Sequence, residues 1–232
     1  MYRSPVSEPH LMILIPAYQE GPRIGAVVEA ARRHLPVVVV DDGSTDDTAA
    51  RAKAAGATVL RQVLNAGKGA ALRTGFGYAL EHGVDAVVTL DGDGQHDPDE
   101  IPSFVAAFEA SHVDLIIGRR DFASMPLVRR VSNTLGRMVI SAAIGQDVPD
   151  NQSGYRLIGR PLMTALLASR ETGFEFEVEM IARCIALGLT LDWVPIRTIY
   201  AGEPSHIRPW AHFSSFLRVA RVARRIVRNR DA

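Results

Sequence analysis

A run of four valines, residues 37–40, ends directly in Asp41 and Asp42. Such a continuous apolar run is typical of a strand that is covered on both faces. Comparable runs occur at residues 11–16, 57–62, 85–91 and 113–118. Ala-rich segments with helical periodicity, such as 24–35 and 69–83, lie between them. This alternation predicts an α/β fold with a mostly parallel sheet flanked by helices on both faces.

The pattern changes after Gly118. Residues 125–145 and 174–187 have helical periodicity, 151–158 have the pattern of a loop that enters a short strand, and 189–200 have that of a further strand. No internal repeat or low-complexity linker divides the sequence. We therefore expect a single domain over residues 1–232, in which the second half covers a site that the first half opens.

Charge and cysteine content exclude several classes of protein. The 26 basic and 26 acidic residues cancel, so attraction to an anionic partner has to be local. The single cysteine, Cys184, excludes an internal disulfide and agrees with a cytoplasmic location. Neither a signal-peptide pattern nor an apolar run of about 20 residues occurs, which predicts a protein without a membrane span.

Polar residues gather where three of the predicted strands end, at residues 17–20, 41–44 and 91–95. Ligands of open α/β sheets bind at the carboxyl ends of the strands, so the three clusters predict one shared site. In the second cluster, Asp41 and Asp42 suit a ribose hydroxyl or a base N–H. The alternative is a plain strand-to-helix turn in which Ser44 or Thr45 caps the next helix. The first cluster lacks the GxGxxG pattern, which excludes a nicotinamide or flavin enzyme.

The third cluster, LDGDGQHD, has oxygen donors at alternate positions: Asp91, Asp93 and Gln95. Such donors suit a hard divalent cation, Mg²⁺ or Mn²⁺, whose shell is completed by substrate phosphates. An EF-hand is excluded because its glycine and terminal glutamate spacing is missing. A plain acidic turn is the remaining alternative.

Six motifs, taken together and in this order, resemble a known family: IPAYQE, VDDGSTDDT, NAGKGAALRTGF, LDGDGQHDP, IIGRR and SGYRL. They are similar to the family 2 glycosyltransferases of the GT-A fold, and most similar to the branch of dolichol-phosphate mannose synthases and bacterial polyprenyl-phosphate sugar transferases. The resemblance covers roughly residues 10–200. It implies a nucleotide-binding half at 10–118 and an acceptor half at 119–200.

The resemblance also implies roles for individual residues. Pro16, Tyr18 and Glu20 would line the nucleotide pocket, and Asp42, with Asp41, would contact the base or ribose. Asp91, Asp93 and Gln95 would hold the metal and, through it, the diphosphate. The remaining assignments are Arg119 near the phosphates, Lys68 and Arg73 beside the nucleotide phosphates or facing solvent, and Asp150, Ser153 and Arg156 on the acceptor side. Gly154 indicates a close backbone approach.

The sequence departs from this family at two points. Tyr200 and His206 stand where the synthases carry cations, and Arg208 is a possible substitute. The QxxRW motif of processive members is missing, which argues against synthesis of a long polysaccharide. His96 is interpreted as a supporting residue, because a phosphate acceptor is already ionised near neutral pH and needs no general base.

Residues 210–230 predict a basic amphipathic helix at the C-terminus. Arg218, Arg221, Arg224, Arg225 and Arg228 share one arc of the helical wheel, and apolar residues fill most of the rest. This pattern suits an anionic membrane interface. A helix packed on the domain with its arginines in solvent is an equal alternative. The charged face lacks aromatic residues, so we expect no nucleic-acid binding.

These observations together predict an inverting enzyme that moves one sugar from a nucleotide diphosphate sugar, GDP-mannose or a UDP-hexose, to a polyprenyl or dolichyl phosphate. It would act as a peripheral protein at the cytoplasmic face of a membrane, and a membrane-protein partner is possible. Two alternatives stay open. A hydroxyl acceptor would require a general base, for which Asp150 is the candidate, and a non-catalytic nucleotide-binding scaffold would require no turnover.

Overall fold

The structure is a computed structural model that describes residues 9–122, 127–173, 175–197 and 209–228. Its seven strands form one sheet in the order β3-β2-β1-β4-β6-β5-β7. They are β1 (Leu11–Ala17), β2 (Val37–Asp41), β3 (Thr58–Arg61), β4 (Ala86–Thr89), β5 (Leu115–Arg120), β6 (Arg156–Gly159) and β7 (Leu191–Ile196). Strand β6 runs antiparallel to β4 and β5, and the other neighbouring pairs are parallel. The predicted mostly parallel α/β sheet is confirmed.

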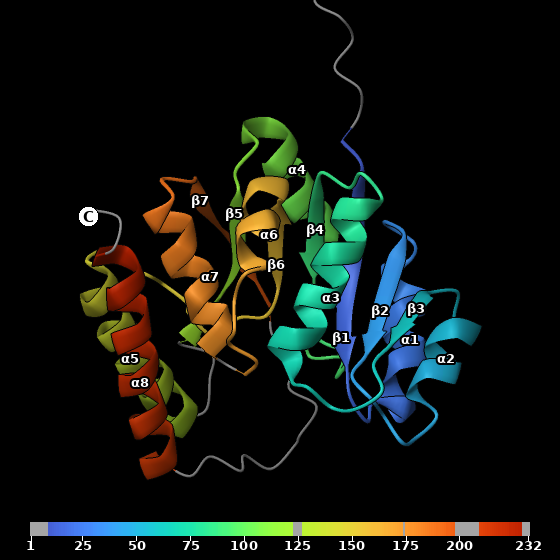
Figure 1. Cartoon of the computed structure of the whole chain (residues 1–232), viewed down its shortest axis with the longest axis horizontal. Coiled ribbons are helices and arrows are strands. Elements are labelled where there is room, and N and C mark those ends of the chain that lie inside the picture. Colours follow the sequence, from blue (N-terminus) through green and yellow to red (C-terminus); the bar gives the residue numbers. More distant parts are fainter. Residues whose placement is uncertain (1–8, 123–126, 174, 198–208, 229–232) are drawn as a thin grey trace, which may run out of the picture.

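Helices cover both faces of this sheet. They are α1 (Gly21–Ala31), α2 (Thr48–Ala54), α3 (Lys68–Glu81), α4 (Ile101–Ser111), α5 (Leu127–Ile144), α6 (Arg160–Leu166), α7 (Glu175–Ala186) and α8 (Pro209–Arg228), and the short 3-10 helix η1 (Pro98–Glu100) precedes α4. Helices α3, α6 and α7 pack on one face, while α1, α2 and α4 pack on the other. In Figure 1, α3, α6 and α7 lie in front of the sheet.

Strand β1 shows why the apolar runs are continuous. Its alternate residues Ile13 and Ile15 belong to the core beneath α1 and α4, while Met12 and Leu14 belong to the core beneath α3. All seven residues of the strand are buried. Because side chains alternate between the faces of a strand, a sheet covered on both sides requires apolar residues at every position.

Both parts of the sequence contribute to the same sheet. The five strands predicted before Gly118 are present as β1 to β5, and the later segments form β6 and β7. Strand β6 is inserted between β4 and β5, so residues 156–159 separate two strands that precede them in the chain. The last residues of the predicted strand at 189–200 lie outside the described part of the chain, since β7 ends at Ile196 and description stops at Arg197.

Helix α8 packs against α5 and α7 at one end of the sheet (Figure 1). Val219 and Ala223 are buried in the core, while the side chains of Arg218, Arg221 and Arg224 are exposed. The apolar side of this part of the helix is therefore already covered by the domain. No helix of the described residues has the length and apolarity that crossing a membrane requires.

Two glycines of α3 give a test of how this helix packs on the sheet. Gly75 lies against Leu14 of β1, so an added Cβ would overlap the buried Leu14 side chain, whereas a Cβ on Gly77 meets nothing within 4 Å. We expect Gly75→Ala to lower the free energy of unfolding by about 1–3 kcal/mol through overpacking. Gly77→Ala, the matched control, should raise the free energy of unfolding by about 0.5–1 kcal/mol, because alanine loses less conformational entropy than glycine when the helix forms. Denaturant unfolding measures both, and equal effects would contradict this packing of α3 on β1.

Candidate functional site

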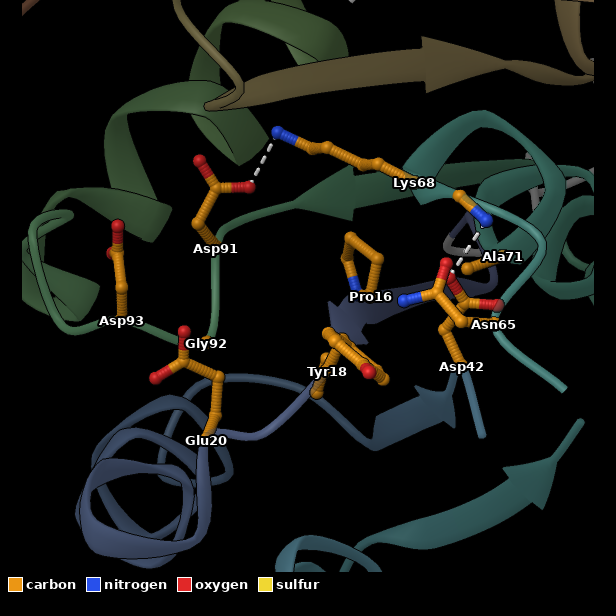
Figure 2. A pocket seen from close by; sticks show the side chains of 12 residues that line it. Pro16, Tyr18, Glu20, Asp42, Asn65, Lys68, Ala71, Asp91, Gly92 and Asp93 are labelled. Atoms are coloured by element: carbon orange, nitrogen blue, oxygen red, sulfur yellow. Dashed lines mark hydrogen bonds and ion pairs between the residues drawn. The ribbon is translucent and has the colours of Figure 1, made fainter. Parts of the chain in front are cut away.

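A cavity of about 400 Å³ opens at the carboxyl ends of β1, β2 and β4. Seven of the residues predicted to form a site line it: Pro16, Tyr18, Glu20, Asp42, Lys68, Asp91 and Asp93. Asn65, Gly67 and Gly92 also line it, and no motif interpretation had assigned a role to Asn65. Figure 2 shows these side chains around one opening, with Lys68 reaching across it toward Asp91. Three polar clusters far apart in the sequence therefore meet, as the strand-end argument predicts.

The segment after β2 holds the segment after β1 in place. The backbone N–H groups of Gln19, Glu20 and Gly21 donate to Ser44 Oγ, Thr48 Oγ1 and Asp46 Oδ2, at 3.0, 2.9 and 3.0 Å. The expectation that Ser44 or Thr45 caps the following helix is wrong, because α2 begins at Thr48 after Asp47 and has no side-chain cap. The polar side chains of this segment instead accept hydrogen bonds from the backbone of the turn that carries Tyr18 and Glu20 into the cavity.

The neighbouring acids Asp41 and Asp42 lie in different surroundings. Both carboxylate oxygens of Asp42 accept backbone N–H groups, from Ala66 and Gly67, at 2.8 Å each. Asp42 thereby holds the loop before α3 against the cavity that it lines. Asp41 is fully buried and does not line this cavity; its Oδ1 accepts the backbone N–H of Ser44 at 3.0 Å. This position gives Asp41 a structural contact inside the turn.

Lys68, the first residue of α3, lies between two carboxylates. Its Nζ is 2.6 Å from Asp91 Oδ1 and 2.7 Å from Glu177 Oε1. Burial alone would lower the pKa of this ammonium, but the two carboxylates raise it above its ordinary value. Burial alone would raise the pKa of Asp91, but the charge of Lys68 opposes this and the pKa is lowered to about 2. Asp91 is therefore an ionised carboxylate at neutral pH.

His96 supports the turn that carries Asp91 and Asp93. The buried imidazole accepts the backbone N–H of Asp91 on Nδ1 at 3.1 Å, so its ring proton lies on Nε2. Burial lowers the pKa of His96, which favours the neutral ring. Gly94 has φ +76°, a value that favours glycine, and Asp93 Oδ1 accepts the backbone N–H of Gln95 at 2.9 Å. A neutral ring held in this way agrees with the supporting role expected for His96.

The donor chemistry at this turn fits a hard divalent cation. Asp91 and Asp93 present two carboxylates to the cavity, and Mg²⁺ sites commonly use one or two carboxylates together with substrate phosphates. Among the described residues that line the cavity, four are acidic and Lys68 is the one cation. A diphosphate would be repelled by these acids unless further positive charge came with it. Gln95 does not line this cavity, and no cluster of three acidic, histidine or cysteine side chains suited to a metal occurs in the described part of the chain.

A second cavity, of about 530 Å³, is lined by four arginines: Arg119, Arg120, Arg130 and Arg137. Arg137 Nη2 is 2.9 Å from Asp147 Oδ1, and Arg120 Nε is 2.7 Å from Asp150 Oδ2. No ion pair of Arg119 or Arg130 with another described residue occurs. Among the described residues, Arg119 and Arg130 are therefore the arginines of this cavity without an ion pair, and Asp121 and Asp147 line the cavity with them.

Asp150 is saturated with hydrogen bonds. It is 1% exposed, and its Oδ1 accepts from Arg120 Nη2 at 2.9 Å and from the backbone N–H groups of Gln152 and Ser153 at 3.0 and 3.2 Å. Its Oδ2 accepts from Arg120 Nε. Both oxygens of this buried carboxylate are therefore occupied by hydrogen bonds within the protein. This placement argues against Asp150 as a general base.

Arg156 is fully buried rather than turned toward a cavity. Its guanidinium donates to the backbone oxygens of Ser153, Glu177 and Asn151, at 2.8, 2.6 and 3.3 Å. In this position Arg156 ties the loop before β6 to α7, and it lines neither of the two cavities. Tyr200, His206 and Arg208, which the family comparison singled out, lie outside the described residues.

The predicted close backbone approach at Gly154 is confirmed. A Cβ added to Gly154 would be 2.8 Å from Asp91 Oδ2 and 2.8 Å from Lys68 Nζ. The loop of residues 149–154 therefore runs from the arginine-lined cavity, which Pro149 lines, to the ion pair of the first cavity. The loop thus contributes Pro149 to the second cavity and lies against Asp91 and Lys68 of the first.

Comparison with known proteins places the chain in a family. Residues 12–166 match the model of glycosyl transferase family 2, and the chain belongs to that family. The undecaprenyl-phosphate mannosyltransferase of Micrococcus luteus is 30% identical over 201 residues, covering 80% of this chain and 82% of the relative. The UDP-N-acetylglucosamine–dolichyl-phosphate N-acetylglucosaminyltransferase of Methanococcus voltae is 31% identical over 216 residues, covering 82% and 86%. The resemblance to the polyprenyl-phosphate branch is confirmed.

Solved structures confirm the fold. Glucosyl-3-phosphoglycerate synthase from Mycobacterium tuberculosis, in complex with Mn²⁺, UDP and glucosyl-3-phosphoglycerate, superposes with a TM-score of 0.72 at 20% identity. The match covers 99% of this chain and 86% of that structure. At 20% sequence identity, this similarity shows that the two proteins share a fold.

The role of His96 is open to a matched test. Asparagine places an acceptor where Nδ1 of histidine lies, whereas leucine fills similar space without one. We expect His96→Leu to lower the free energy of unfolding by about 1–3 kcal/mol more than His96→Asn does, because it leaves the buried N–H of Asp91 unpaired. Denaturant unfolding of the two variants gives this difference, and equal stabilities would show that the hydrogen bond contributes nothing.

Proposed function

We propose that this protein transfers a single sugar from a nucleotide diphosphate sugar to a polyprenyl phosphate. The observation that carries the proposal is the pair of cavities: one presents Asp91 and Asp93, the other presents arginines, and residues 149–154 join them. The first suits a donor diphosphate with its cation, and the second suits the phosphate of an acceptor. The names of the two curated relatives point to the same acceptor class.

In the proposed reaction, an oxygen of the acceptor phosphate forms a bond to the anomeric carbon of the sugar. The bond from that carbon to the donor diphosphate breaks with inversion, and its electron pair leaves with the nucleoside diphosphate. Asp91 and Asp93 would hold Mg²⁺ or Mn²⁺, which would supply positive charge to the leaving diphosphate. Lys68 would donate to the same diphosphate, and Arg119 would orient the acceptor phosphate.

A hydroxyl acceptor is less well supported. Its attack would require a base, and the candidate Asp150 has its oxygens occupied by Arg120 and two backbone amides. A phosphate acceptor needs no such base near neutral pH. The guanidinium of Arg119, which forms no ion pair with another described residue and lines the second cavity, favours an anionic acceptor over a neutral one.

The first test is transfer of labelled sugar from GDP-mannose, UDP-glucose and UDP-N-acetylglucosamine to a short polyprenyl phosphate, with Mg²⁺ or Mn²⁺ and with EDTA as control. We expect label in the lipid phase from one donor, lost with EDTA. Asp93→Ala should lower transfer by at least about 100-fold, because a charge that stabilises the leaving group is lost. Asp99→Ala is the matched control, since Asp99 is 70% exposed and pairs with Arg33 outside the cavity.

The outcomes separate the alternatives. Hydrolysis of the donor without label in the lipid would favour another acceptor, and no turnover with any donor would favour a nucleotide-binding scaffold. Normal transfer by Asp93→Ala would contradict the metal assignment.

We further propose that the arginines of α8 attract the enzyme to the cytoplasmic face of an anionic membrane. The exposed side chains of Arg218, Arg221, Arg224, Arg225 and Arg228 support this, whereas the buried Val219 and Ala223 argue against insertion of this part of the helix. The attraction would then be electrostatic, at about 1 kcal/mol for each arginine near the surface. A basic surface of this kind also suits an acidic membrane-protein partner.

Replacing these five arginines with glutamine should weaken binding to phosphatidylglycerol vesicles by at least about tenfold, and raising the salt concentration should do the same to the unchanged protein. Vesicle flotation measures both. Neutralising exposed cations elsewhere, at Arg33 after α1 and at Arg51 and Lys53 in α2, serves as the control. Salt-resistant binding that survives the α8 substitutions would contradict the electrostatic attachment.

A further inference from the structure

Helix α7 places a buried carboxylate beside the donor cavity. Glu177 lies in the first turn of α7, and its side chain is 7% exposed. Within the described residues, Lys68 Nζ is the hydrogen-bond partner of this carboxylate, at 2.7 Å. The backbone oxygen of Glu177 is fixed separately, by Arg156 Nη1 at 2.6 Å. Any effect of the Glu177 carboxylate on a ligand in the cavity would therefore pass through Lys68.

Lys68 has one donor left for a ligand. An ammonium carries three N–H groups, and Asp91 and Glu177 accept two of them. The Lys68 side chain is 34% exposed and lines the cavity, and Figure 2 shows it extended over the opening. The two carboxylates thus restrict where the ammonium, and with it the remaining N–H group, can lie.

The backbone of Gly154 lies on another side of the ammonium. Gly154 lies so close that even a Cβ would be 2.8 Å from Lys68 Nζ. Lys68 therefore cannot move away from the cavity along that side. Glu177 and Asp91 hold it from two further directions.

We propose that Glu177 is a positioning residue of the donor site, which holds the Lys68 ammonium where its third N–H meets the diphosphate of the donor. The inference rests on the proposed function and adds a residue from the acceptor half to it. An ammonium on a four-carbon stem otherwise has many rotamers, and fixing one of them in advance lowers the entropic cost of binding. Glu177 contributes this without touching the ligand.

Two substitutions distinguish the effect of where the Glu177 carboxylate lies from the effect of its charge. Glu177→Gln keeps an oxygen acceptor at the same reach and removes the charge, whereas Glu177→Asp keeps the charge and shortens the reach by one methylene. Because a charge-assisted hydrogen bond to the diphosphate would be lost, we expect Glu177→Asp to weaken binding of the diphosphate about tenfold. Glu177→Gln should stay within about threefold of the unchanged protein, since a neutral acceptor still holds the ammonium.

The measurement is titration calorimetry with UDP and GDP in the presence of Mg²⁺, with uridine and guanosine as ligands without phosphates. Glu175→Gln, which removes a carboxylate from the same turn of α7, is the control. Lys68→Met should weaken diphosphate binding about as much as Glu177→Asp, and adding Glu177→Asp to Lys68→Met should cause no further loss. Binding of the nucleosides should not change in any of these variants.

Three results would overturn the proposal: diphosphate binding by Glu177→Asp within twofold of the unchanged protein, equal weakening of nucleoside and diphosphate, or additive losses in the double variant. Equal weakening would indicate a purely structural role for Glu177. If the unchanged protein binds neither UDP nor GDP, the donor site itself is wrong and the proposed function falls with the inference. Diphosphate binding that Glu177 variants leave intact would overturn the inference alone.

Discussion

The arrangement of the site depends on one ammonium shared by two carboxylates. Lys68 begins α3, Asp91 follows β4 and Glu177 lies on α7, so three segments from both halves of the chain meet at a single charge. Burying any one of these groups alone would be costly, and each is tolerated because the others compensate it. The close approach of Gly154 belongs to the same cluster. The position of the loop that joins the two cavities is thus coupled to the charges that face the donor.

Much of the donor cavity follows from the sequence because strand ends are easily recognised. The apolar runs place Tyr18, Asp42 and Asp91 at one edge of a parallel sheet, and a shared site is the direct consequence. What the pattern leaves open is which face a residue takes. In a sheet covered on both sides, the run of valines before Asp41 and Asp42 has no polar alternation to reveal it. The structure shows that Asp42 shares the face of Val38 and Val40, beneath α3, and thereby reaches the loop at Ala66.

The acceptor half is less predictable from the sequence because its strands do not lie in the sheet in the order in which they follow one another in the chain. Arg156 opens β6, and an arginine after a glycine-containing loop suggests a ligand contact as readily as a buried hydrogen-bond donor. Only the insertion of β6 between β4 and β5, with α7 packed over it, encloses the guanidinium. Glu177 was missed for the same reason: an acid near the start of a helix resembles a residue that complements the helix dipole in solvent. Its burial depends on the contact with Lys68, which is 109 residues away in the sequence.

The position of β6 also bears on how the chain reaches this fold. Strand β5 pairs with β6 and β7, and both follow it in the sequence. A growing chain that has not yet reached Arg156 can pair β1 to β4 with one another, but β5 has no neighbour among them. Both edges of an apolar strand then stay open until some 40 further residues have been added. During synthesis, this interval is the one in which β5 is most exposed to pairing with a strand of another molecule.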